Sequence, residues 1–147
     1  MTWAWKYGIV AVVTLVHDVA IPTGLFAVLG KYRGVEVDSL FITALLTVMG
    51  FSVHDTIVVF DRIRENLLIA KNKKDLDSLV NISVNQTFAR SVNTSLTLIL
   101  VLLALYLFGA ESLKNFNLLV LLGTIIGTYS SIFVASPLLT FFNSRAR

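Results

Sequence analysis

The chain has 147 residues, of which 56% are hydrophobic and only 14% are charged, and its mean hydropathy is +0.80. A soluble domain of this length needs far more polar surface, so the composition excludes one and indicates an integral membrane protein embedded in a lipid bilayer. The chain has no cysteine, which excludes disulfides and thiolate metal sites, and its net charge of +3 gives no reason to expect a nucleic-acid partner.

Four apolar runs are each long enough to cross the ~30 Å hydrocarbon core as a helix. They lie near residues 7–29, 39–60, 88–108 and 116–141. We therefore expect an all-α integral membrane domain over 1–147, with four transmembrane helices and a charged cytoplasmic loop at 61–87. Near the span ends, eight Lys and Arg residues lie on the side of both termini and three on the other side. The positive-inside rule then places both termini in the cytoplasm.

The first span carries an acid near its middle, in the pair His17-Asp18, and Pro22 follows one turn later. Proline removes a backbone donor and predicts a kink, which is also ordinary in membrane helices. Asp18 is more informative, because acids are rare within a bilayer unless they have a role.

The second span contains His54 and Asp55, two ionisable residues whose placement inside a bilayer costs free energy. Thr43, Thr47, Gly50 and His54 share one side of the helix, and Asp55 lies on the flank of that side. A carboxyl group at this depth must be paired, hydrated or protonated. We expect the helix to continue beyond the membrane through Asp61–Asn66.

The third span has a polar stripe on one helix face, made of Gln86, Arg90, Asn93, Thr94 and Thr97. Arg90 is either a buried partner of Asp55 or an anchor that extends to the interface. The continuation of the stripe into the membrane favours the buried role.

The fourth span contains Gly123 and Gly127 at a spacing that allows close helix contact, followed by Ser130 and Ser131. This pattern predicts that the fourth helix packs against the polar cluster.

The polar residues of the spans are expected at similar depths: Asp18, His54, Asp55, Arg90, Asn93 and Ser130. Asp55 is then either paired with Arg90 or held neutral, and an acid whose protonation responds to geometry suits proton-coupled transport. A metal hydrolase is disfavoured, because two histidines and scattered acids supply too few ligands. A structural four-helix scaffold remains the alternative. No cofactor or metal is expected.

Several motifs occur in one order along the chain. They are Leu15-Val-His-Asp18, Gly50-Phe-Ser-Val-His-Asp-Thr-Ile-Val-Val-Phe-Asp-Arg-Ile-Arg-Glu-Asn66, Val84-Asn-Gln-Thr-Phe-Ala-Arg90 and Gly127-Thr-Tyr-Ser-Ser-Ile-Phe133. The chain thereby resembles the C-terminal membrane portion of the SecF branch of the SecD/SecF family, in the resistance–nodulation–division (RND) superfamily. This resemblance implies half of an RND-type transmembrane bundle.

The resemblance also implies a function that is not enzymatic. It predicts a subunit of the Sec protein translocase, driven by the proton motive force, in the cytoplasmic (inner) membrane. Its partners would be SecD, the SecYEG translocon and exported polypeptides. By motif, the proton-coupling residues would be Asp55 and Arg90. The supporting candidates are Asp18, His54, Asn93, Thr94, Ser130 and Ser131.

Two departures from the family pattern bear on this interpretation. His54 stands where the family usually has asparagine, which leaves open whether it acts as an ionisable or only as a hydrogen-bonding group. A full SecF has six spans and an extracytoplasmic domain, so we expect this chain to lack the first two spans and that domain. The alternatives are an RND-type exporter of lipids or small molecules, a fragment without function, and coupling to sodium in place of protons.

Overall fold

The structure is a computed structural model that describes residues 4–34, 37–70 and 76–144, and every regular element in these ranges is a helix. The elements are α1 (Ala4–Arg33), α2 (Ser39–Ala70), α3 (Leu76–Phe108), the short 3₁₀ helix η1 (Glu111–Leu113), α4 (Lys114–Phe133) and α5 (Ala135–Ser144). Four helical segments are long and apolar enough to cross a membrane. The predicted all-α membrane fold with four spans is therefore confirmed.

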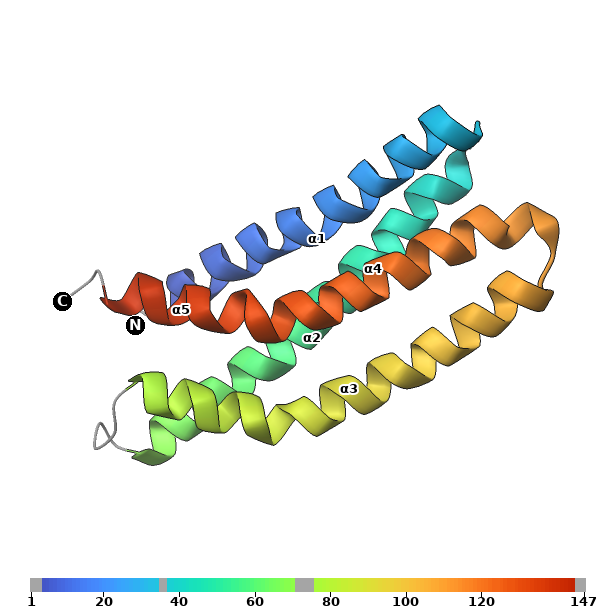
Figure 1. The fold of residues 1–147 in the computed structure, drawn as a ribbon. Helices are drawn as coiled ribbons and strands as arrows, with labels where there is room; N and C mark the ends of the chain where they lie inside the picture. Colours follow the sequence, from blue (N-terminus) through green and yellow to red (C-terminus); the bar gives the residue numbers. More distant parts are fainter. Residues whose placement is uncertain (1–3, 35–36, 71–75, 145–147) are drawn as a thin grey trace.

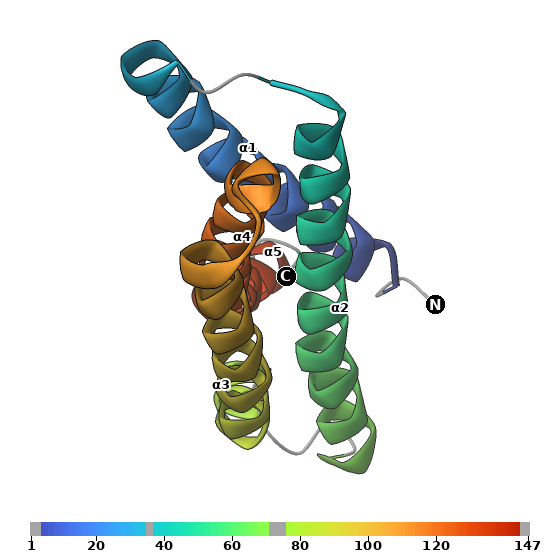
Figure 2. The same ribbon diagram turned by 90° about the vertical axis from the view of Figure 1, so that its right-hand side faces the viewer.

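The long helices lie side by side, and α4 is the central one (Figure 1). It contacts α1, α2 and α3, and α5 continues from it toward the start of α1. The view in Figure 2 shows α3 beside the lower part of α2, with the start of α4 above α3. The start of α1, the end of α2, the start of α3 and the end of α5 lie at one end of the bundle. Which end faces the cytoplasm stays a prediction.

Local chemistry sets the connection between α1 and α2. Gly34 follows the last turn of α1 with a φ of 66°, a conformation that glycine adopts without steric cost, and its N–H donates to the carbonyl of Gly30. Asp38 then caps α2, because its Oδ1 accepts a hydrogen bond of 3.0 Å from the N–H of Phe41.

The segment expected as a charged cytoplasmic loop at 61–87 is largely helical. The expected continuation of the second helix through Asp61–Asn66 is confirmed, since α2 continues to Ala70, and α3 already begins at Leu76. Two sets of side-chain hydrogen bonds join the extended parts: Arg62 Nε donates to Gln86 Oε1 at 2.8 Å, and Asn66 Nδ2 donates to Ser83 Oγ at 2.7 Å. These bonds stabilise both helices beyond their apolar runs. Hydropathy alone does not predict this extension.

The fourth span is also different from expectation, because it is not one helix over 116–141. α4 ends at Phe133, Val134 has a φ of −108°, and α5 begins at Ala135. Pro137 explains the break, since it lacks an N–H and its ring clashes with the preceding helical turn. At the third position of a new helix it needs no N–H partner.

The glycine spacing of α4 has the predicted effect. A methyl group added to Gly123 would lie 2.2 Å from Cγ2 of Val48, and one added to Gly127 would lie 3.3 Å from Cβ of Ser52. At Gly123 only a residue without a side chain allows α2 to approach this closely, whereas at Gly127 an added methyl group would be a tight contact. The predicted close helix contact is confirmed, and its partner is α2.

Two apolar clusters fill the interior. One contains Val10, Val59, Phe60, Ile63, Val80, Ala135 and Leu139. The other contains Phe26, Ala44, Leu102, Leu119, Val120 and Leu121. Along α1, α2 and the fourth span, most of the buried polar residues occur between the members of the first cluster and those of the second, and Asn117 is an exception. They form a polar layer with apolar packing on both sides, which includes Thr14, Asp18, Ser52, Asp55, Thr56, Thr124, Ser130 and Ser131.

Candidate functional site

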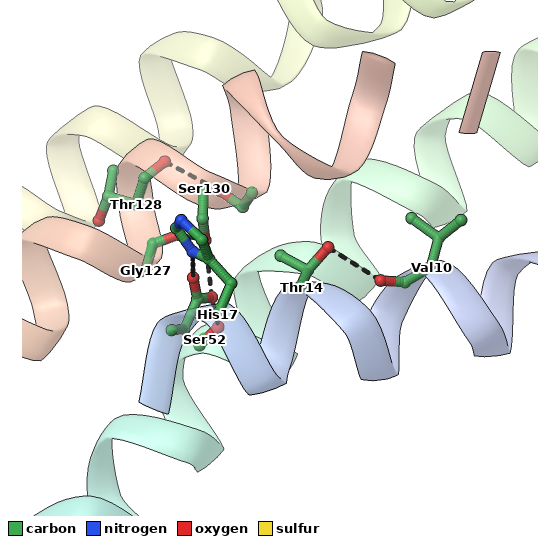
Figure 3. A network of polar contacts seen from close by, with 9 residues as sticks. Val10, Thr14, His17, Ser52, Gly127, Thr128 and Ser130 are labelled. Carbon is green, nitrogen blue, oxygen red and sulfur yellow. Dashed lines mark hydrogen bonds and ion pairs between the residues drawn. The ribbon is translucent and has the colours of Figure 1, made fainter. Parts of the chain in front are cut away.

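Asp18 lies at the centre of the polar layer and has no exposed surface. Its Oδ2 accepts hydrogen bonds from the hydroxyl groups of Ser52 on α2 and Ser130 on α4, the latter at 2.6 Å. His17 Nδ1 lies 2.9 Å from Asp18 Oδ1, where an N–H donates to the carboxylate. Figure 3 shows His17, Ser52 and Ser130 converging from three helices. The hydrogen-bonding capacity of the Asp18 carboxyl is thus met by three side chains, none of which is a lysine or an arginine.

Asp55 occupies a second, similar place on α2. It is 9% exposed. Its Oδ1 accepts a hydrogen bond of 2.8 Å from Ser91 on α3, and its Oδ2 accepts one from Ser131 on α4. Both acids are thus held by hydroxyl groups from two neighbouring helices. Ser130 and Ser131 are consecutive, so α4 touches both acids at once.

The structure brings together four of the candidates identified from the sequence, Asp18, Asp55, Ser130 and Ser131. Two further donors, Ser52 and Ser91, were missed. Ser91 belongs to a second polar face of α3 on which hydroxyl residues recur every four positions and are buried: Ser83, Thr87, Ser91 and Ser95. That four-residue spacing is the signal that would have found it. Ser95 Oγ continues the layer, 2.6 Å from Thr128 Oγ1 of α4.

The remaining candidates face outward. His54, Arg90, Asn93 and Thr94 are exposed in this chain. The expectation that Arg90 is buried is therefore wrong for the chain by itself, because the face of α3 that enters the bundle carries the small hydroxyls instead. Within the described ranges, Arg90 forms no side-chain ion pair with Asp55, whose partners are Ser91 and Ser131.

Arg90 lines a groove between α2 and α3 with a volume of about 310 Å³. The groove lies one helical turn from the Asp55 site, since Val58 follows Asp55 on α2 and Thr87 precedes Ser91 on α3. Its rim carries both signs of charge, from Asp61, Arg62, Glu65 and Arg90. There Arg62 Nε donates a hydrogen bond to Gln86, and Arg62 Nη1 forms an ion pair with Glu65 Oε2 at 2.5 Å. The groove therefore extends from the charged residues Asp61, Arg62 and Glu65 to within one helical turn of Asp55.

Hydroxyl groups that can donate or accept hydrogen bonds surround each carboxyl. Among the described residues, neither acid forms an ion pair with a lysine or arginine. Across residues 4–34, 37–70 and 76–144, no three His, Asp or Glu side chains lie together as a set of metal ligands. Both acids thus lie in an enclosed, polar environment.

Comparison with known proteins gives consistent results. A protein translocase subunit SecF of Thermobaculum terrenum is 57% identical over 141 residues, which cover 96% of this chain and 44% of that relative. A protein translocase subunit SecF of Synechocystis is 50% identical over 132 residues, covering 90% of this chain and 42% of that relative. This chain therefore spans less than half the length of these relatives.

The fold is shared with solved structures. SecDF from Thermus thermophilus, a translocon-associated membrane protein, matches with a TM-score of 0.89 at 42% identity, covering 97% of this chain and 19% of that one. SecDF in a super-membrane-facing form matches with the same TM-score at 41% identity, covering 99% and 19% of the two chains. The family model described as protein export membrane protein SecD/SecF, C-terminal, matches residues 1–145. On these grounds the chain belongs to the SecD/SecF C-terminal family of protein export membrane proteins.

Proposed function

We propose that this chain is the membrane part of a SecF-type subunit that assists protein export across the cytoplasmic membrane. Relatives that are 50% and 57% identical over most of the chain carry the name protein translocase subunit SecF. The four apolar helical segments support a multi-pass position in the membrane. In this role the protein works with SecD beside the SecYEG channel on exported polypeptides, and it performs no enzymatic reaction.

The energy source in this proposal is the proton motive force. The observation that carries it is the pair of carboxyls, Asp18 and Asp55, buried between two apolar clusters with only hydroxyl and imidazole donors around them. An ionised acid in a bilayer interior is costly, so proton binding changes the free energy of the site strongly. Asp55 is the proton carrier, and Arg90 in the adjacent groove modulates its access.

The outward polar face of α3 supports SecD as the partner. Arg90, Asn93, Thr94 and Thr97 are exposed on α3, next to a mostly exposed apolar run from Leu98 to Leu107. A charged side chain at the bilayer centre costs about 2.5–3.5 kcal/mol on insertion scales. A partner with polar groups on its own membrane helices removes that cost. The site would then be completed at this interface, with Arg90 enclosed there.

The test replaces Asp55 by asparagine, which keeps the shape of the side chain and removes the ionisable group. We expect Asp55→Asn to abolish the part of protein secretion that depends on an imposed pH gradient, measured in inverted membrane vesicles with a secreted reporter protein. The matched control is Asp77→Asn, an exposed acid in the first turn of α3, which should leave secretion unchanged. Gradient-dependent secretion at the unmodified rate in a stably inserted Asp55→Asn protein would contradict the proposal.

A further inference from the structure

Asp18 is sheltered more completely than Asp55, and its surroundings contain few other ionisable groups. On α1 the neighbouring ionisable group is His17, whose side chain is 33% exposed and reaches from Asp18 toward the outside of the bundle. From α2 the ionisable groups are Asp55, which is bonded to two serines, and the exposed His54. The described parts of α4 and α5 contribute hydroxyl groups there and no acid or base. Among the described residues, the ionisable group in contact with Asp18 is therefore the His17 imidazole.

The serines of α4 each have two hydrogen-bond acceptors within reach. Ser130 Oγ lies 2.6 Å from Asp18 Oδ2 and 3.1 Å from the carbonyl oxygen of Gly127. Ser131 Oγ contacts Asp55 Oδ2 and lies 3.0 Å from the carbonyl oxygen of Thr128. A hydroxyl group has one proton to donate, so it serves one of the two acceptors at a time.

This arrangement satisfies both charge states of each acid. When the carboxyl is ionised, the serine hydroxyl donates to it. When the carboxyl is protonated, its own O–H donates to the serine Oγ, and the serine proton turns to the helix carbonyl. No buried group loses its partner in either state, and an unpaired buried group is what normally opposes such a change.

We propose that Asp18 is a second proton-binding carboxyl, and that Ser130 and Ser131 are positioning residues that switch between carboxylate and helix carbonyl as Asp18 and Asp55 take up and release protons. The proposal rests on the proposed function at Asp55 and extends it to two sites on one helix. For Asp18 the proton passes from His17 Nδ1 to Asp18 Oδ1, so that an N–H bond breaks, an O–H bond forms, and the other ring nitrogen of His17 takes up a proton from outside. Rotation of the carboxyl group then brings the protonated oxygen to Ser130, and the proton leaves by the reverse steps.

Infrared difference spectroscopy tests the proposal directly, because a protonated carboxyl has a C=O stretching band that the carboxylate lacks. The protein is placed in phosphatidylcholine vesicles, and spectra at acid and alkaline pH are subtracted. We expect two bands from buried acids, of which Asp18→Asn removes one and Asp55→Asn the other. Ser130→Ala should move the Asp18 band to higher frequency and leave the Asp55 band in place, and Ser131→Ala should do the reverse.

A matched control is Ser136→Ala, since Ser136 is buried near the same end of the fourth span and touches neither acid. It should leave both bands unchanged. Circular dichroism confirms that each variant keeps its helices. If the Asp55 band titrates and no band depends on Asp18, the second site is refuted while the proposed function stands. If neither acid titrates, both proposals fail together. Bands that do not respond to Ser130→Ala and Ser131→Ala refute the switching role of the serines.

Discussion

α3 and α4 both place hydroxyl groups within the membrane, but they use them differently. In the most apolar stretch of the fourth span, Glu111–Phe141, half of the residues are buried, against 17% in that of the third span, Asp77–Phe108. α4 directs Ser130 and Ser131 inward to the two acids. α3 directs Ser91 inward and presents Arg90 and Asn93 to the outside. α4 is therefore the centre of the described interior, whereas α3 leaves a polar face exposed, for which a partner is proposed above.

We expect the largest loss of stability from a substitution at the close contact between α4 and α2. Gly123→Leu on α4 places a large side chain where even a methyl group would lie 2.2 Å from Val48. Overpacking of this kind costs about 3 kcal/mol, which we expect as a loss in the free energy of unfolding, measured in mixed micelles. The matched control is Gly24→Leu on α1, where an added methyl group meets no atom within 4 Å. Equal losses in both variants would show that the α2–α4 contact is not the critical one.

A smaller effect is expected from the polar layer. Ser130→Ala removes one of the three donors of Asp18. Leaving a buried acid with an unmet hydrogen bond costs about 1–3 kcal/mol in the free energy of unfolding. Ser136→Ala should cost nothing, because the Ser136 hydroxyl is buried without a hydrogen-bond partner among the described residues. If Ser136→Ala is the more damaging of the two, the description of the layer is wrong.

The smallest effect on stability is expected from the outward face of α3. Asn93→Leu combined with Thr97→Leu should change the free energy of unfolding of the chain by less than about 0.5 kcal/mol, because both side chains are exposed. The same double variant should reduce co-purification with SecD. Leu96→Ala, an exposed apolar position on the same helix, is the control. If the double variant is destabilised, or if it associates with SecD as strongly as the unmodified chain, the outward face of α3 is not a partner surface and the contrast with α4 does not hold.

The fold was largely predictable from the sequence, because membrane helices must be apolar over a fixed length and small residues must lie where helices touch. Those two constraints identified the four spans and the contact at Gly123 and Gly127. The two acids were equally evident, since an acid in an apolar run is conspicuous. By contrast, the break at Val134 was not predicted, because a proline inside an apolar run is compatible with a kink or with a new helix.

The partners of the acids were harder to predict. Serine is common in membrane helices, so Ser52 and Ser91 gave no distinctive signal beside the strongly polar Arg90. Periodicity also groups residues by face without stating which face turns inward. On α3 both faces are polar, and the choice between them depends on volume: small hydroxyls fit between packed helices, while an arginine does not. The proton-coupling role of Asp55 and Arg90 stays a prediction.

The length of α2 has a mechanical consequence. It is one unbroken helix from Ser39 to Ala70, with Asp55 at its middle. The part beyond Asp55 is about 22 Å long at the rise of an α-helix, so a tilt of about 10° at the acid moves the far end by about 4 Å. Hydrogen bonds from Arg62 and Asn66 join this part of α2 to Gln86 and Ser83 of α3. Any tilt of α2 at Asp55 would therefore be carried to its far end, because the helix has no break between Asp55 and Ala70.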